Sequence, residues 1–314
     1  MKTMIKTAGA ASLLAVAVAS TSAVAAPLAE LGFSQHAGFG TPTFFGGSLS
    51  YKPASDVPNT DPLAPAGTNT SFAWEGANDP VESSIAIQSY NNSTAPVADL
   101  DGTPLRYTAG FAVDGDGQWN AGDWWVIDTI TQTNNTLTTL GGAIVDPLWV
   151  VDTLANLRIY ADAARTDLAY ADPTTTNSIS FNETLNTDSE AACAGPNPLE
   201  TLCDDIFTAS SDAFAPVSFV RDGYRYDLSF TLFAGTSTDN GVPAGTSEVV
   251  LNPDGTITVY TPEFDPGTSS IHVAMSYMAT AVPEPSILGL VGAGMLALGF
   301  AGRRRKQVQA KKAA

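Results

Sequence analysis

Alternation of apolar and polar residues with a period of two constrains the fold of this chain more than any other feature. Between residues 224 and 232, apolar Tyr224, Tyr226, Leu228, Phe230 and Leu232 alternate with polar residues. Because successive side chains of a strand point to opposite faces, this pattern predicts a half-buried β-strand. Shorter alternations occur at 125–130, 157–160, 179–181 and 271–277. The sequence therefore predicts an all-β fold, a single antiparallel β-sandwich over residues 26–281.

One hairpin is also predicted by its turn residues. Apolar segments at 249–251 and 257–260 flank Asn252-Pro253-Asp254-Gly255, a connection made of turn-forming residues. An Ala-rich segment at 153–169 is compatible with a helix. The alternation of Leu157 and Ile159 with Arg158 and Tyr160 favours a strand at its start.

The charge of the chain excludes one large class of functions. It has 14 Lys and Arg residues against 32 Asp and Glu residues, and most of the basic residues lie near the two ends. Nucleic-acid binding depends mainly on basic side chains that neutralise phosphates, so no nucleic-acid partner is expected. An apolar fraction of 44% is sufficient for a packed core despite this acidity.

The N-terminus has the organisation of a secretory signal peptide. Lys2 and Lys6 precede an uncharged stretch from Ala8 to Ala19, and Ala23-Val24-Ala25 supplies small residues for signal peptidase. We expect residues 1–25 to be removed by cleavage after Ala25. The alternative is a buried N-terminal helix, but the stretch lacks polar residues at helical spacing.

The C-terminus, residues 282–314, contains three consecutive parts. Val282-Pro283-Glu284-Pro285 is followed by an uncharged segment at 286–302 and then by Arg303, Arg304 and Arg305. As a helix, the uncharged segment would reach roughly 25 Å, the lower limit for crossing a hydrocarbon core of about 30 Å. The arginines would stay in the cytoplasm, so the segment predicts a short transmembrane helix with the acidic domain on the far side.

These three parts in this order resemble the PEP-CTERM sorting signal of bacteria that make exopolysaccharide. The resemblance implies that an exosortase, a membrane protease, cuts near Val282 to Pro285 after an inner-membrane intermediate. The domain would then reach the cell surface or the extracellular matrix. The two prolines keep the cleavage region extended and out of the helix. The alternative is a permanent single-pass anchor.

A second resemblance covers the middle of the chain. The segment Ser178 to Asn186, followed by Cys193 and by Cys203-Asp204-Asp205, is similar to the THxN family of PEP-CTERM proteins. The segment 130–135 corresponds to the family's Thr-His-x-Asn box, with Gln132 in place of the histidine. The family has no established biochemical role, so this resemblance implies a fold and a destination without a reaction.

The two cysteines, Cys193 and Cys203, enclose a loop rich in turn-forming residues. In an exported protein this spacing predicts a disulfide that closes the loop, worth about 2–3 kcal/mol in the chain-entropy model. Zinc binding is the weaker alternative, because His36 and His272 are the only histidines.

An acidic segment, 113–123, suggests a calcium site. If Asp114 is position 3 of a calcium loop, then Asp116, Asn120 and Asp123 occupy positions 5, 9 and 12. Position 1 would be Ala112, which supplies no side-chain oxygen. The alternative is a plain acidic turn between two strands, since Asp-Gly pairs are strong turn formers. Calcium is thus the one cofactor that the sequence suggests.

Catalytic motifs are not recognisable, and the sequence predicts no enzyme. Gly-x-Ser-x-Gly, Walker and His-Glu-x-x-His patterns are absent from the sequence. We expect a structural or carbohydrate-binding role, with exopolysaccharide as a partner. Trp119, Trp124 and Trp125 could stack on sugars or pack in the core. The alternative function is a secreted hydrolase that pairs Glu183 with Asp204 or Asp205.

Overall fold

The protein is all-β over the part of the chain that can be described. The computed structural model describes residues 26–28, 30–45, 49–76, 81–92, 99–100, 121–135, 147–184, 196–201, 203–210, 214–262, 266–282 and 294–295. The strands are β1 Gly32–Phe39, β2 Thr43–Phe44, β3 Leu49–Tyr51, β4 Val57–Pro58, β5 Asn69–Gly76, β6 Glu82–Ser89, β7 Trp125–Asn134, β8 Trp149–Tyr160, β9 Leu168–Ala171, β10 Thr175–Asn182, β11 Asp205–Ser210, β12 Val217–Arg221, β13 Tyr224–Asp239, β14 Val242–Thr246, β15 Glu248–Leu251, β16 Thr256–Thr261 and β17 Gly267–Ala281. A 3₁₀ turn, η1, covers Pro53–Ser55.

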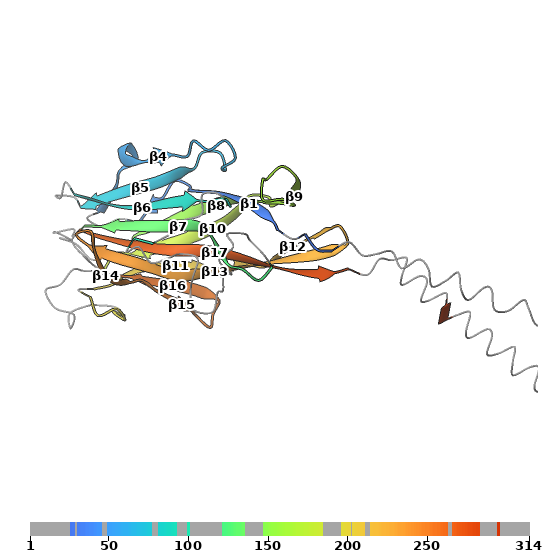
Figure 1. Cartoon of the computed structure of the whole chain (residues 1–314). Coiled ribbons are helices and arrows are strands. Elements are labelled where there is room, and N and C mark those ends of the chain that lie inside the picture. The colour runs from blue at the N-terminus through green and yellow to red at the C-terminus, as the bar shows by residue number, and fades with distance from the viewer. Residues whose placement is uncertain are drawn as a thin grey trace, which may run out of the picture. The chain divides into compact units, whose positions relative to one another are not determined.

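The strands form one antiparallel series in which sequence neighbours are often not sheet neighbours. From one end, the hydrogen-bonded order is β15, β16, β11, β10, β8, β1, β5, β6, β7, β17 and β13. The short strand β2 pairs with the first residues of β8, and β9 pairs with its last residues. The strands β3 and β4 pair with β5. In Figure 1 the green strand β7 accordingly lies beside the red strand β17.

The series curls, so that its two ends meet. Ser247, between β14 and β15, donates its backbone N–H to the carbonyl of Gly235 on β13 at 3.0 Å. All 17 described strands therefore belong to one sheet, and the expected division into two packed sheets of a sandwich is not confirmed. Alternation predicts which residues face inward, but both architectures bury one face of each strand, so the pattern does not distinguish them.

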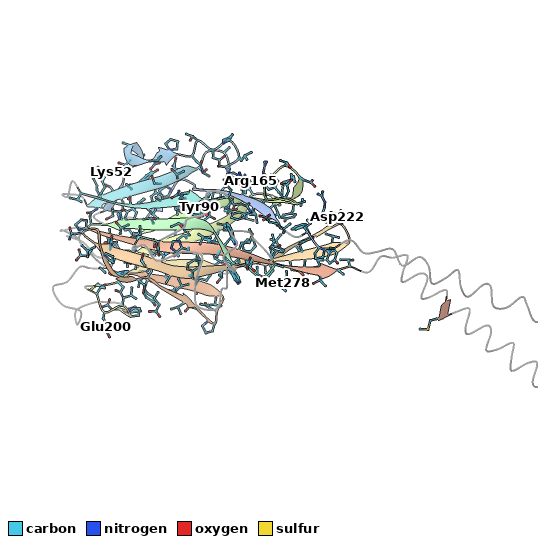
Figure 2. The ribbon with its side chains drawn as sticks, in the orientation of Figure 1. Lys52, Tyr90, Arg165, Glu200, Asp222 and Met278 are labelled. Carbon is cyan, nitrogen blue, oxygen red and sulfur yellow. The ribbon has the colours of Figure 1, made fainter. Side chains whose placement is uncertain are left out.

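The concave face of the curl holds an aromatic core. Trp74, Trp149 and Phe181 come from three different strands and are fully buried. The rings of Trp149 and Phe181 stack with centroids 4.9 Å apart, and the Trp74 and Trp149 centroids are 5.5 Å apart. Each such ring removes a large apolar area from water. Outward positions contrast with this core, and Met278 on β17, labelled in Figure 2, is 59% exposed.

The predicted strands are confirmed where the alternation is clearest. Tyr226 and Leu228 on β13 are fully buried, whereas Arg225 before them and Ser229 after them are exposed. The predicted hairpin is β15 and β16, and Gly255 in its turn has a φ of 83°, a conformation that glycine adopts without strain. The segment that begins at Thr153 continues strand β8, as the alternation of Leu157 and Ile159 predicted.

The chain divides into two compact units. The larger consists of Leu28–Phe219 and Tyr226–Ala279, and the smaller of Met1–Pro27, Val220–Arg225 and Thr280–Ala314. Within the smaller unit, Asp222 and Gly223 form a tight turn with positive φ values of 51° and 78°. Val282 donates its N–H to the carbonyl of Gly223 at 2.8 Å.

The predicted signal peptide, residues 1–25, lies outside the described residues. So does the predicted transmembrane segment, except for residues 294–295, which are helical. Among the residues that the structure describes, no helix is long and apolar enough to cross a membrane.

Candidate functional site

The described residues of the two THxN-like segments meet in one buried polar cluster, here called the Asp205 cluster. Asp205 begins β11 and is fully buried. Its Oδ2 accepts hydrogen bonds from Gln132 Nε2 and Asn134 Nδ2, each at 2.8 Å. Its Oδ1 accepts the backbone N–H of Thr184 at 3.2 Å. Thr261 at the end of β16 donates its hydroxyl to Gln132 Oε1 at 2.6 Å.

The cluster crosses the interior of the curled sheet. Gln132 and Asn134 lie on β7, whereas Asp205 lies on β11, and neither strand pairs with the other. Period-two alternation points Gln132 and Asn134 to the same face of β7, which is the buried face. These hydrogen bonds therefore join two distant parts of the sheet through its core.

A second carboxyl group, that of Glu183, lies beside Asp205 and is 2% exposed. Burial raises the pKa of Glu183 well above its usual value, and the negative charge of Asp205 raises it further. The nearby Trp74 side chain acts in the opposite direction without cancelling this rise, and neither carboxyl oxygen of Glu183 makes a hydrogen bond of normal geometry with another described residue. Burial and the neighbouring Asp205 thus both favour the protonated form of the Glu183 carboxyl group.

This pair includes two of the residues suggested for a hydrolase, but it is sealed from solvent. Asp205 is fully buried, and neither it nor Glu183 lines the described cavity. Asp204 faces elsewhere: its carboxylate accepts the N–H of Leu199 at 2.7 Å and the hydroxyl of Thr201 at 2.5 Å. A glycosidase needs its two carboxyl groups on either side of a bound sugar, whereas both described groups of this pair are buried.

A second buried cluster surrounds Asp99. His272 Nε2 lies 3.1 Å from Asp99 Oδ2, and Ser270 donates its hydroxyl to Asp99 Oδ1 at 2.7 Å. The N–H of Thr236 donates to Asp99 Oδ2 at 2.7 Å. Burial acts to raise the pKa of Asp99, but the interactions with His272 and Ser270 outweigh it and hold the pKa well below the usual value.

His272 Nδ1 also lies 2.9 Å from the Thr129 hydroxyl. Thr129, His272 and Asp99 therefore form a hydroxyl–imidazole–carboxylate series, the combination of groups found in nucleophilic catalytic sites. His272 is only 1% exposed, and neither it nor Thr129 lines the described cavity. Gly235 packs so closely that a Cβ added there would lie 2.1 Å from Ser270 Oγ. Close packing without access favours a structural role for this cluster.

A third carboxylate, that of Asp128, lies on the wall of the cavity described below. Ser89 donates to its Oδ1 at 2.6 Å and Gln35 Nε2 to its Oδ2 at 2.9 Å. Burial raises the pKa of Asp128 to about 7, although both hydrogen bonds act in the opposite direction. It lies on the same strand as Gln132, but in a separate cluster.

Most of the remaining predicted site residues lie outside the described part of the chain. These are Ala25, Pro283, Glu284, Pro285, Arg303, Arg304 and Arg305 for processing, Asp114, Asp116 and Asn120 for calcium, and Cys193. Asp123 is described and 7% exposed, and no cluster of metal-binding side chains occurs among the described residues. The calcium site stays a prediction.

The predicted disulfide is described at one end only. Cys203 is buried and is not a free thiol. Because Cys193 lies outside the described residues, the bond between the two stays a prediction.

The tryptophans proposed for sugar stacking differ in burial where they are described. Trp125 is 2% exposed and packs edge-on against Phe33, with ring centroids 6.1 Å apart. It therefore belongs to the core. Trp124 is half-buried, and Trp119 lies outside the described residues.

The fold and the buried clusters define an all-β domain held together by internal polar contacts. Residues 281–306 match the PEP-CTERM protein-sorting motif, which marks the chain as an exported protein that an exosortase processes and sorts to the cell surface. The match does not extend to the THxN-like segments, so that resemblance is unconfirmed. Comparison with curated proteins and with solved structures finds no match.

Sequence reasoning missed the Asp99 and Asp128 clusters. Their signal is a polar residue at an inward position of a strand, as with His272 between Ile271 and Val273. A single polar residue in an apolar strand shows that a partner is needed, but not which distant residue supplies it.

Proposed function

We propose that this chain is a non-catalytic protein of the cell surface or exopolysaccharide matrix, with a structural or carbohydrate-binding role. Signal peptidase would remove the N-terminal segment, and an exosortase would cut near Val282 to Pro285. The matched sorting motif at residues 281–306 supports this route. The strongly acidic composition suits a protein that works outside the cell and binds neither nucleic acid nor anionic lipid surfaces.

The observation that carries the non-catalytic role is the burial of the carboxyl pair. Glu183 and Asp205 belong to the set that the sequence suggested for a hydrolase, and both lie in the core. Both carboxylate oxygens of Asp205 already accept hydrogen bonds, from Gln132, Asn134 and the backbone N–H of Thr184. A hydrolase would need these groups open to a substrate.

We also infer that the chain is a THxN-like protein in which the motif residues hold the fold together. Segments separated in sequence, around Gln132, Glu183 and Asp205, meet in one cluster, as the residues of a shared structural motif would. Gln132 supplies a hydrogen-bond donor at the position of the family's histidine.

The sorting route is tested by intact-mass spectrometry of the protein from its native host, with and without the exosortase gene. The expected wild-type mass ends near Val282 to Pro285, while the deletion strain retains Arg303 to Ala314. If both strains keep the tail, the segment is a permanent anchor, and the proposed release to the surface is wrong.

The non-catalytic role is tested with the processed protein and the exopolysaccharide of the same host. We expect the protein to sediment with the polysaccharide without releasing new reducing ends. Release of reducing ends by wild type, lost in a folded Asp205→Asn variant, would instead establish the hydrolase.

A further inference from the structure

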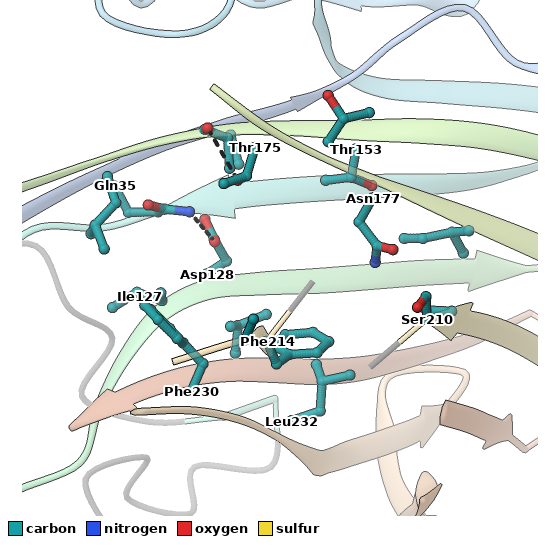
Figure 3. A pocket seen from close by; sticks show the side chains of 18 of the residues that line it. Gln35, Ile127, Asp128, Thr153, Thr175, Asn177, Ser210, Phe214, Phe230 and Leu232 are labelled. Carbon is teal, nitrogen blue, oxygen red and sulfur yellow. Dashed lines mark hydrogen bonds between the residues drawn. The ribbon is translucent and has the colours of Figure 1, made fainter. Parts of the chain in front are cut away.

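The larger unit contains a cavity of about 610 Å³ on the concave side of the sheet. A volume of this order suits a small-molecule site, since such sites commonly enclose roughly 300–1,000 Å³. The cavity lies among strands β1, β6, β7, β8, β10, β11, β13 and β17, together with residues 214–217. Figure 3 shows Ile127, Phe214, Phe230 and Leu232 on one side of it.

Most of the wall is apolar. Its larger apolar side chains include Ile87, Ile130, Leu157, Phe214, Phe230 and Leu232. Their branched and aromatic side chains favour an occupant with a hydrocarbon body.

The wall also holds two polar atoms that have no hydrogen-bond partner among the described residues. Gln35 is 7% exposed, and its Nε2 donates to Asp128, which leaves its Oε1 without a donor. The Thr153 hydroxyl on β8 is likewise buried and unpaired. Figure 3 shows both side chains on the cavity wall. Buried polar atoms are normally paired, so these two are available to a polar group of an occupant.

The charge of the wall restricts that polar group. Asp172 and Asp128 are the ionisable residues among the described residues that line the cavity, and no Lys, Arg or His joins them. An anionic head would meet a carboxylate with no cation to balance it, which is costly in a buried site. A hydroxyl carries no charge and can donate to Gln35 Oε1.

The cavity has an opening lined by polar residues. Thr175, Thr176 and Ser178 on β10 line it and are exposed to solvent, with Asn177 half-buried between them. This polar rim over an apolar interior gives a small molecule a route to the cavity.

We propose that this cavity is a binding site for a small neutral amphiphile, an alkyl or similarly apolar body bearing a hydroxyl group that donates to Gln35 Oε1. The Thr153 hydroxyl, on the same wall as Gln35, can also donate a hydrogen bond to the ligand's hydroxyl group or accept one from it. The hydrocarbon body fills the space between Phe230, Leu232 and Ala155. This site is independent of whether the protein surface also binds polysaccharide.

The test is isothermal titration of the exosortase-processed protein at pH 8, with decan-1-ol as probe and decanoate as its charged counterpart. We expect decan-1-ol to bind with one site per chain and decanoate to bind at least tenfold more weakly. Absence of decan-1-ol binding up to its solubility, or equal binding of decanoate, would overturn the proposal.

Two variants place the binding in the cavity. Ala155→Phe fills the space and is expected to abolish binding, whereas Ala171→Phe, at an exposed position on β9, is expected to leave it unchanged. Thr153→Val keeps the shape, removes one unpaired hydroxyl, and is expected to weaken binding roughly threefold to tenfold. Unchanged affinity in both Ala155→Phe and Thr153→Val would show that the probe binds elsewhere, and Thr153→Val decides the matter if Ala155→Phe does not fold.

Discussion

Gln132 Nε2 donates a 2.8 Å hydrogen bond to Asp205 Oδ2, although the two residues lie 73 positions apart on strands that do not pair. The same glutamine accepts the hydroxyl of Thr261 through its Oε1 at 2.6 Å. Both ends of the amide are therefore used inside the core, where an unpaired polar group is costly. Gln132 acts as a polar link between β7, β11 and β16.

Replacing Gln132 by leucine should destabilise the fold. The change removes one donor from Asp205 and leaves the Thr261 hydroxyl without its acceptor, at a cost of about 1–3 kcal/mol. Urea unfolding of both proteins measures the difference. Gln88→Leu is the matched control, since Gln88 is exposed on the adjacent strand β6 and its loss should change stability by less than about 0.5 kcal/mol.

A histidine at position 132 should retain more stability than leucine does, because an imidazole N–H can also donate to Asp205. Equal losses for Gln132→His and Gln132→Leu would show that the donor at this position contributes little.

The two carboxyl groups of the Asp205 cluster should respond oppositely to the same chemical change. Asp205→Asn replaces one carboxylate oxygen by an NH₂ donor, which then faces either the donors of Gln132 and Asn134 or that of Thr184, so we expect a loss of about 3 kcal/mol or more. Glu183→Gln replaces a group whose pKa is already raised by burial and by Asp205, so it should be neutral or stabilising at pH 7. Denaturant titrations compare the two variants, and a larger loss for Glu183→Gln would contradict this account.

Asp128 should make the protein less stable as the pH rises from about 4 to about 8. Its pKa is raised from the usual value to about 7 in the folded protein. The folded state therefore binds more protons than the unfolded state within this interval, and the stabilisation, complete below about pH 4, is lost as the pH passes 7. The slope attributable to one such group approaches about 1.4 kcal/mol per pH unit.

Asp128→Asn should remove this contribution, because the amide stays neutral. It can accept from Ser89 and, once the Gln35 amide turns over, donate to Gln35 Oε1. Unfolding midpoints at pH 5, 6, 7 and 8 measure the difference between wild type and variant. Parallel curves for the two proteins would show that Asp128 does not titrate as described.

Asp99 should have the opposite pH dependence. Its pKa lies below the usual value because His272 and Ser270 outweigh the effect of burial, so its stabilisation is present above about pH 4 and is lost on further acidification. Asp99→Asn should cost about 1–3 kcal/mol at pH 7, and the cost should shrink towards pH 3. Asp152→Asn, at an exposed position on β8, is the control and should show neither effect.

The elements of the fold were largely predictable, while their arrangement was not. Inward positions such as Tyr226 and Leu228 follow from alternation, and the turn before Gly255 follows from its residue types. The pairing of β1 with β8, or of β7 with β17, leaves no local mark in the sequence, because it depends on long-range contacts. The curl of one sheet in place of a two-sheet sandwich was missed for the same reason.

For the candidate sites, too, some residues could be predicted from the sequence, whereas most of their partners could not. The sequence offered Glu183 with Asp204 or Asp205 as one example of a carboxylate pair among many acidic residues. The structure does bring Glu183 and Asp205 together, although in the core and not in a cleft. The partnership of Gln35 with Asp128 joins residues 93 positions apart, and no periodicity connects them. Buried polar contacts of this kind depend on the finished fold.

The position of β17 in the sheet also sets the order of events during export. The first part of this strand, Gly267 to Met275, pairs with β7, and the strand ends at Ala281, where the sorting motif begins. A chain that crosses a membrane from its N-terminus must deliver β17 before the sheet can be completed, and sheets with such distant pairings form slowly. Folding of the domain and arrival of the cleavage region are thus coupled in time. Any change that delays β17 would present the exosortase with an unfinished domain whose β7 edge is open to other chains.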